Sequence, residues 1–141
     1  MTAPTPDELS TGILKKLRSS IQKKQKRKLS ESLVLILGVT LQPDGGTDAH
    51  PAVKDLMLHL IKEGSLVSYN DPYVPYMRLE NTHLLSQGLF ESFLRQQDCV
   101  VILTPHRLYD WKYIVSHSEF VLDFAEAITF PAENVENFRF R

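Results

Sequence analysis

The residues best suited to bind an anion lie in one loop, residues 39–50, which follows a continuous apolar run at residues 32–38. A run of this kind that ends in glycine is typical of a strand buried on both faces of a parallel sheet. Pro51 then suits the first position of a helix. A strand, a loop and a helix N-terminus in this order are where α/β proteins hold phosphates. Within the loop we expect ligand contacts from backbone N–H groups and hydroxyls, at Thr40, Gly45, Gly46 and Thr47.

The same loop also carries negative charge. Asp44 and Asp48 would repel an anion. The alternative interpretation is a loop that only turns the chain into the next helix, and the residues leave both interpretations open.

Further candidates follow two other predicted strands. Asp71 and Tyr73 come after the strand at residues 65–69, and Thr104 and His106 end the strand at residues 98–104. Ligands approach an open α/β sheet at the carboxyl ends of its strands. His106 is therefore either a ligand contact or a helix-capping residue, and Tyr73 either stacks on a base or covers the core.

Other chemistry finds little support in the residues. The histidines show no metal-ligand spacing with cysteine or carboxylates, so we predict no metal site. No Gly-x-Ser-x-Gly elbow and no placeable pair of carboxylates is present. Cys99 begins an apolar strand, and we interpret it as an unreactive core residue. We therefore predict no catalytic residue.

Alternating strands and helices predict the fold. We expect an α/β domain with a Rossmann-like open parallel sheet, helices on both faces and an N-terminal helix before it. We expect an irregular segment at residues 73–85 that contains a short strand near residues 77–79. The predicted strands are 32–38, 65–69, 98–104 and 119–123, and the predicted helices are 51–63, 87–95 and 106–115.

We divide the chain into three parts: an N-terminal arm and amphipathic helix at residues 1–29, the α/β domain at 30–123 and a tail at 124–141. The tail shows no clear period, and we expect it to lie over the body or a neighbour through its aromatic side chains, Phe130, Phe138 and Phe140.

The N-terminal helix, residues 7–28, has a thin apolar stripe formed by Leu9, Ile13, Leu17 and Ile21. The stripe needs a partner surface, so we expect a homodimer or a partner subunit bound through this helix. We interpret the basic run at its end, residues 23–28, as a solvated helix terminus that suits the helix dipole. The alternative is an anionic partner.

Composition sets broad limits. At 141 residues the chain predicts one domain, and its formal net charge of −1 argues against a basic nucleic-acid binder. No apolar run is long enough to span a membrane. The N-terminus lacks the pattern of a secretory signal, and a single cysteine suits a reducing compartment. We therefore expect a cytoplasmic protein.

Five short segments occur in a familiar order: VLILG at residues 34–38, QPD at 42–44, PA at 51–52, YNDPYV at 69–74 and VVILTPH at 100–106. In this order they resemble the C-terminal, UDP-binding domain of the UDP-glucose/GDP-mannose dehydrogenase family. The N-terminal helix is similar to the end of the long helix that links the two main domains of that family and builds its dimer.

The resemblance implies which ligand this chain binds and also implies that the chain has no catalytic activity alone. Members of the family oxidise the C6 hydroxyl of a nucleotide sugar with two NAD⁺, using an NAD domain, a cysteine and a lysine that precede the linking helix. This sequence starts near the end of that helix and has no Gly-x-Gly-x-x-Gly fingerprint. The resemblance thus implies binding of UDP or a UDP-sugar, no cofactor bound by this chain, NAD only through a missing catalytic domain, and no activity alone.

The loop departs from the family pattern. Gln42 stands where the family has lysine and Asp48 where it has arginine; Ala49 and His50 replace a glutamate and a serine. A hydrogen bond to a charged group contributes about 1.5–3 kcal/mol, so losing two cations would weaken binding by roughly two to four orders of magnitude. Three hypotheses follow: a nucleotide-sugar-binding module that retains Gln42 as a contact, a subunit of a split dehydrogenase, or an interaction domain that has lost its ligand.

Overall fold

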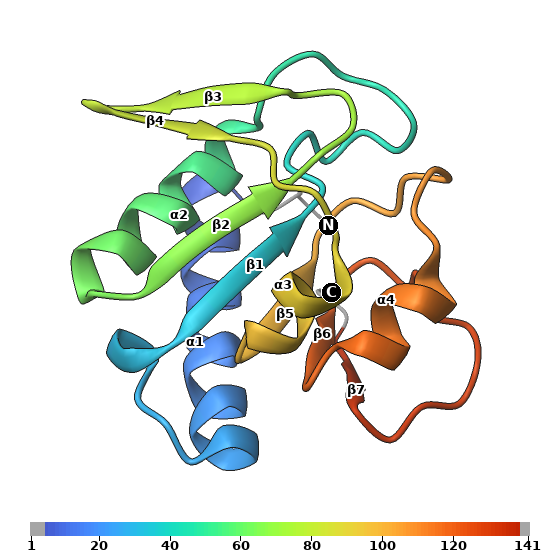
Figure 1. The fold of residues 1–141 in the computed structure, drawn as a ribbon. Coiled ribbons are helices and arrows are strands. Elements are labelled where there is room, and N and C mark those ends of the chain that lie inside the picture. Colours follow the sequence, from blue (N-terminus) through green and yellow to red (C-terminus); the bar gives the residue numbers. More distant parts are fainter. Residues whose placement is uncertain (1–4, 139–141) are drawn as a thin grey trace.

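The computed structural model of the chain describes residues 5–138, so Phe140 and the first four residues of the predicted arm lie outside the described residues. Five parallel strands form the central sheet, which confirms the predicted fold class (Figure 1). In the order in which they lie side by side, they are β2 (Leu66–Asn70), β1 (Leu33–Leu37), β5 (Cys99–Ile102), β6 (Val121–Asp123) and β7 (Val135–Asn137).

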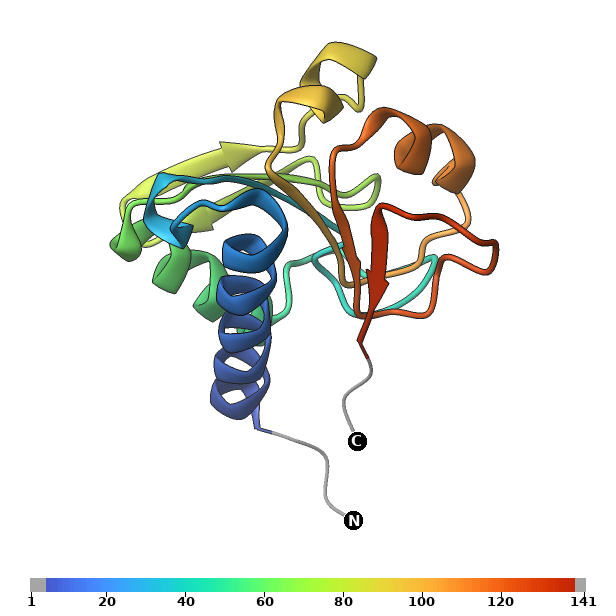
Figure 2. The ribbon, with the colours of Figure 1, turned by 90° about the horizontal axis from the view of Figure 1, so that it is seen from below.

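Helices cover both faces of this sheet. Figure 2 shows α1 (Pro6–Gln25) and α2 (Pro51–Glu63) on one side, with α3 (Glu91–Gln96) and α4 (Trp111–His117) on the other. The side chains of β1 alternate between two cores: Val34 and Ile36 pack towards α1 and α2, whereas Leu35 and Leu37 pack towards α3 and α4. The short 3₁₀ turn η1 (Leu29–Glu31) leads from α1 into β1.

The bounds of α2 agree with the predicted helix at residues 51–63. Pro51 occupies the first turn, the His50 ring accepts a hydrogen bond from the Ala52 N–H, and Gly64 ends the helix at φ 103°. The other two predicted helices begin later than expected. Before α3, the Ser86 N–H donates to the Pro75 carbonyl and the Gln87 N–H donates to the Tyr69 carbonyl of β2. Asp110 caps α4 and accepts from the Tyr113 N–H.

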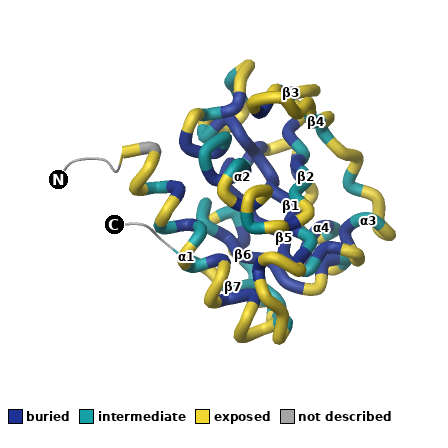
Figure 3. The backbone as a smooth tube through the Cα atoms, turned by 90° about the vertical axis from the view of Figure 1, so that its left-hand side faces the viewer, coloured by how far each residue is buried: buried dark blue, intermediate teal, exposed yellow. Residues whose placement is uncertain are grey.

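Helix α1 packs on its own domain. Ile13, Leu17 and Ile21 are buried in the same core as α2 and β1, and buried and exposed positions alternate along the helix in Figure 3. It ends at Gln25, because Lys26 adopts a left-handed conformation at φ 55°, three residues before the predicted end. The stripe is therefore covered within the chain and no longer argues for a dimer.

A two-stranded antiparallel hairpin, β3 (Tyr76–Leu79) and β4 (Thr82–Leu85), occupies the segment predicted to be mostly irregular. The expected short strand at residues 77–79 lies within β3, where Met77 and Leu79 are buried. Strand β4 was not predicted, because all four of its residues are exposed or half-buried and give no apolar alternation. The turn between the strands depends on Glu80 at φ 53° instead of the glycine that usually marks a hairpin.

The segment analysed as a tail contributes a strand. Residues 135–137 form β7, parallel to β6, and the Phe138 N–H donates to the Asp123 carbonyl. The sequence shows no period there because the strand has three residues and none of them is fully buried. Glu136 of β7 forms an ion pair with Lys16 and accepts a hydrogen bond from the Ser20 hydroxyl at 3.3 Å, so β7 also anchors α1.

The link between β7 and α1 predicts a pH-dependent stability. Partial burial raises the pKa of Glu136, but Lys16, Ser20 and Lys24 together outweigh burial and hold the pKa below its ordinary 4.5. Its stabilising effect is therefore fully present above the pKa of an unfolded glutamate and is lost as the pH falls through the lowered native pKa. We expect Glu136→Gln to lower the free energy of unfolding by about 0.5–1 kcal/mol at pH 7.

Urea unfolding between pH 7 and pH 3.5 measures this difference, with the exposed Glu133→Gln as the matched control. The difference between wild type and Glu136→Gln should shrink on the acid side, whereas the control should match wild type throughout. A difference that stays constant over the whole range would rule out the ion pair as its cause.

Candidate functional site

A buried carboxylate, Asp71, lies where β1, β2 and β5 end. Its oxygens accept hydrogen bonds from the Val39 N–H at 2.8 Å, the Tyr73 N–H at 2.8 Å and the His106 ring at 3.0 Å. The side chains of Asp71 and His106 are both 0% exposed. One carboxylate thus joins the loops that follow three different strands.

The second ring nitrogen of His106 determines where the ring carries its proton. Its Nδ1 lies 2.9 Å from the Asp44 backbone N–H and accepts from it, so Nδ1 is unprotonated. The proton is therefore on Nε2, which donates it to the Asp71 carboxylate. In this arrangement both ring nitrogens are occupied by the protein itself.

Three more contacts join the loop at residues 39–50 to the loop after β5. The Thr104 hydroxyl accepts from the Leu41 N–H at 3.0 Å. The Asp44 carboxylate accepts from the Arg107 backbone N–H at 2.6 Å and lies 3.1 Å from its guanidinium Nε. Asp44, which the sequence suggested would only repel an anion, is thus a structural residue of this edge.

Two glycines allow the loops to approach closely. Gly38 has φ +82°, and a Cβ there would lie 2.3 Å from the Thr104 Cβ. Gly46 has φ +88°, and a Cβ there would lie 2.7 Å from the Thr40 Cβ. Both positions therefore require glycine on steric and conformational grounds.

Aromatic rings cover the buried pair. The Tyr73 ring centroid lies 4.8 Å from that of His106, and the Tyr109 ring lies 5.7 Å away on tilted planes. The Tyr109 hydroxyl donates to the Asn70 carbonyl at 2.8 Å, and burial raises its pKa, which keeps the phenol protonated. Burial also raises the pKa of Tyr69 to about 12, and its hydroxyl donates to the Val74 carbonyl. Tyr73 is half-buried and lies with its ring against that of His106.

The predicted ligand residues fall into two groups. Asp71, Tyr73, Thr104 and His106 meet in the network just described, and their polar groups face other parts of the protein. The second group lies in the loop at residues 39–50. The Thr40 hydroxyl donates to the Gln42 carbonyl and accepts from the Gln42 N–H, and the Gly45 N–H also donates to the Gln42 carbonyl. The side chains of Gln42 and Thr47 are exposed. A ligand-binding role for either group stays a prediction.

Sequence reasoning missed Tyr109 as a member of this edge. Residue 109 fell within the predicted helix at residues 106–115, but Tyr109 precedes α4 and its hydroxyl donates to the Asn70 carbonyl at the end of β2. The only signal available was its position three residues after His106.

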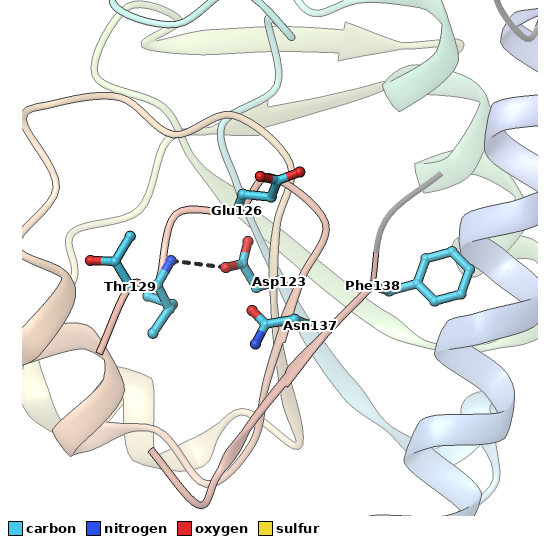
Figure 4. A pocket seen from close by; sticks show the side chains of 6 residues that line it. Asp123, Glu126, Thr129, Asn137 and Phe138 are labelled. Carbon is cyan, nitrogen blue, oxygen red and sulfur yellow. Dashed lines mark hydrogen bonds between the residues drawn. The ribbon is translucent and has the colours of Figure 1, made fainter. Parts of the chain in front are cut away.

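One cavity opens at the ends of β6 and β7, with a volume of about 360 Å³. Figure 4 shows the Asp123 carboxylate in its wall, where it accepts from the backbone N–H groups of Ala125, Ala127 and Ile128. Glu126 lines it as well. Two carboxylates at this cavity disfavour an anionic ligand.

A second cavity, of about 350 Å³, lies between the start of α2 and β3, and we call it the α2–β3 cavity. Of the predicted ligand residues, Thr47 lines it. Its wall consists of Thr47, Asp48, Ala49, Lys54, Val74, Pro75, Tyr76, Met77 and Arg78.

A sequence model of a known protein family matches most of this chain. The sequence model of the UDP-glucose/GDP-mannose dehydrogenase family, UDP binding domain, matches residues 35–135. The chain belongs to this family. The match begins within β1 and extends to the first residue of β7. It therefore includes the whole sheet except the first two residues of β1 and the last two residues of β7. A search of curated protein sequences gave no match.

Solved structures share the fold. An NDP-N-acetyl-D-galactosaminuronic acid dehydrogenase from Methanosarcina mazei Go1 is 16% identical with a TM-score of 0.70, over 99% of this chain and 32% of that one. A UDP-D-ManNAc dehydrogenase from Pyrococcus horikoshii is 20% identical with a TM-score of 0.63, over 91% and 30%. The UDP-N-acetyl-mannosamine dehydrogenase Cap5O from S. aureus is 18% identical with a TM-score of 0.63, over 92% and 29%. This member of the family thus spans about a third of the length of these structures.

The part of the chain that the structure describes contains neither a membrane-spanning helix nor a group of side chains suited to a metal ion. None of its helices is long and apolar enough to cross a membrane. Nor do three or more of its His, Cys, Asp and Glu side chains form a group that could hold a metal ion.

We predict that a conservative substitution of the buried Asp71 lowers the stability of the protein strongly. Asp71→Asn keeps the shape but places an amide N–H₂ opposite donors that now bond to a carboxylate, so we expect a loss of about 2–4 kcal/mol in unfolding free energy. For a domain of this size that lowers Tm by roughly 6–12 °C. Asp110→Asn is the matched control: it is exposed, and asparagine caps a helix equally well. Equal Tm values for the two variants would show that the pair does not hold the loops.

We predict that the Cys99 thiol is unreactive in the folded protein. It is 0% exposed at the start of β5, and burial raises its pKa well above the ordinary value. We expect the folded protein to react with a disulfide reagent at pH 8 far more slowly than a free thiol, because only the exposed thiolate attacks. In urea one equivalent should react at once. Rapid reaction of the folded protein would contradict this assignment and reopen a nucleophilic role.

Proposed function

We propose that this chain is a nucleotide-sugar-binding module that binds UDP or a UDP-sugar at the carboxyl edge of its sheet. The observation that carries the proposal is the match of residues 35–135 to the UDP-binding domain of the family. The loops at this edge also support it, because their internal hydrogen bonds hold them in a formed arrangement before any ligand arrives. A formed site loses less conformational entropy on binding.

The proposal assigns no chemical step to this chain. Oxidation would need NAD and catalytic groups that the family keeps on its other domain, so we propose that this chain binds no cofactor. NAD would then act only through a catalytic domain or a partner subunit, as in a split dehydrogenase. A cytoplasmic location and assembly as a dimer or with such a partner belong to the same proposal.

A specific observation favours a second candidate function, an interaction domain that has lost its ligand. The two family cations are replaced by Gln42 and Asp48, and the remaining acid, Asp44, is bound to Arg107. Without those cations, a diphosphate has little to bind in the loop itself. A measurement of nucleotide binding separates the two functions.

We predict that UDP compounds raise the Tm of the chain selectively. A ligand at 100 times its dissociation constant stabilises by about 2.7 kcal/mol, which corresponds to roughly 6–12 °C for a domain of this size. Thermal unfolding is measured with millimolar UDP, UDP-glucose, UDP-N-acetylglucosamine and GDP-mannose. ATP is the control, because it carries at least as much phosphate charge on a different base.

A rise with the UDP compounds alone supports the module. An equal rise with ATP means that phosphate is bound without recognition of uridine and contradicts it. No rise with any nucleotide leaves the interaction domain as the better description.

A further inference from the structure

The α2–β3 cavity carries two cations from two different elements. Lys54 comes from the first turns of α2 and Arg78 from β3, and both line the cavity. Asp48 contributes one negative charge, so the ionised side chains in its wall sum to a net positive charge. This is the opposite of the acidic cavity at β6 and β7.

Lys54 occupies an unusual position for a lysine. The N-terminus of a helix is the positive end of its dipole and favours acidic residues, yet the first turn of α2 contains none. The backbone there has no donors to spare at residues 52–54: the Ala52 N–H donates to the His50 ring, and the Val53 and Lys54 N–H groups donate to the His50 carbonyl. An anion at this helix end would therefore be held by side chains.

Lys54 and Arg78 lack anionic partners within residues 5–138. Among the residues that the structure describes, no carboxylate lies within 4.0 Å of the Lys54 ammonium or the Arg78 guanidinium. Arg78 donates from Nε to the Glu80 carbonyl at 3.2 Å, which orients its side chain without neutralising it. By contrast, Lys62 on the same helix lies 4.0 Å from a Glu80 carboxylate oxygen.

We propose that Lys54 and Arg78 bind the diphosphate of the nucleotide ligand in the α2–β3 cavity and replace the two cations missing at Gln42 and Asp48. The inference rests on the proposed function and assigns its anion site. The cavity volume of about 350 Å³ lies within the range of small-molecule sites, and the Thr47 hydroxyl supplies a further donor. The phosphate site is thus moved from the middle of the loop to its end and to the hairpin.

The test compares Lys54→Gln and Arg78→Gln with wild type in titrations of UDP and of inorganic pyrophosphate. Glutamine keeps much of each side chain but removes the charge. Each variant should bind both ligands about 10-fold or more weakly, since a charged hydrogen bond is lost. The matched control is Lys62→Gln, one lysine of the same helix outside the cavity, which should bind like wild type. The Tm of Lys54→Gln should not fall, because a cation leaves the positive end of α2.

The outcomes separate the inference from the function on which it rests. If UDP binds and neither cavity variant weakens it, the anion site is wrong and the module stands. If pyrophosphate binds through Lys54 and Arg78 but UDP binds no better than pyrophosphate or ATP, the anion site stands and uridine recognition fails. Equal weakening by Lys62→Gln would show general attraction and overturn the site, and no binding of either ligand would overturn both.

Discussion

The carboxyl edge of the sheet depends on the hydrogen bonds of one buried carboxylate. Asp71 accepts from the loop after β1, from its own loop and from His106 after β5, at distances of 2.8–3.0 Å. A buried charge is tolerated only when its hydrogen-bonding capacity is used, so these donors must stay in place for the chain to remain folded. The positions of three loops therefore follow from one ionised group, and Gly38 and Gly46 allow the close approaches that it demands.

Because these polar groups already form hydrogen bonds within the protein, few of them remain available to bind a ligand. His106 has both ring nitrogens bound and Tyr73 covers it, so the residues most suggestive of chemistry in the sequence stabilise the edge. Outside this network, Gln42 and Thr47 are exposed, and the α2–β3 cavity offers further polar side chains to a ligand. Membership of a nucleotide-binding family and a loop without cations are compatible if the charge is supplied from elsewhere on the surface.

The sequence predicts those elements whose signals are local. Strands β1 and β5 appear as apolar runs because both faces are buried, and α2 is bounded by Pro51 and Gly64. Strand β7 and strand β4 could not be found, since they are short and their residues are exposed or half-buried. Topology predicted that Asp71 and His106 lie at the same edge of the sheet, but their pairing joins residues 35 positions apart, and no spacing rule indicates it.

The packing of α1 bears on how this chain meets a partner. Its apolar stripe is buried against the chain's own core, and β7 fixes the helix further through Glu136 and Lys16. A partner bound along α1 would therefore contact the exposed positions of the helix, among them Lys15, Lys23 and Lys24. Such a contact would be polar and salt-dependent instead of hydrophobic. A split dehydrogenase assembled through this helix would thus need an acidic surface on its catalytic partner, and an interface elsewhere on the domain would need no such complement.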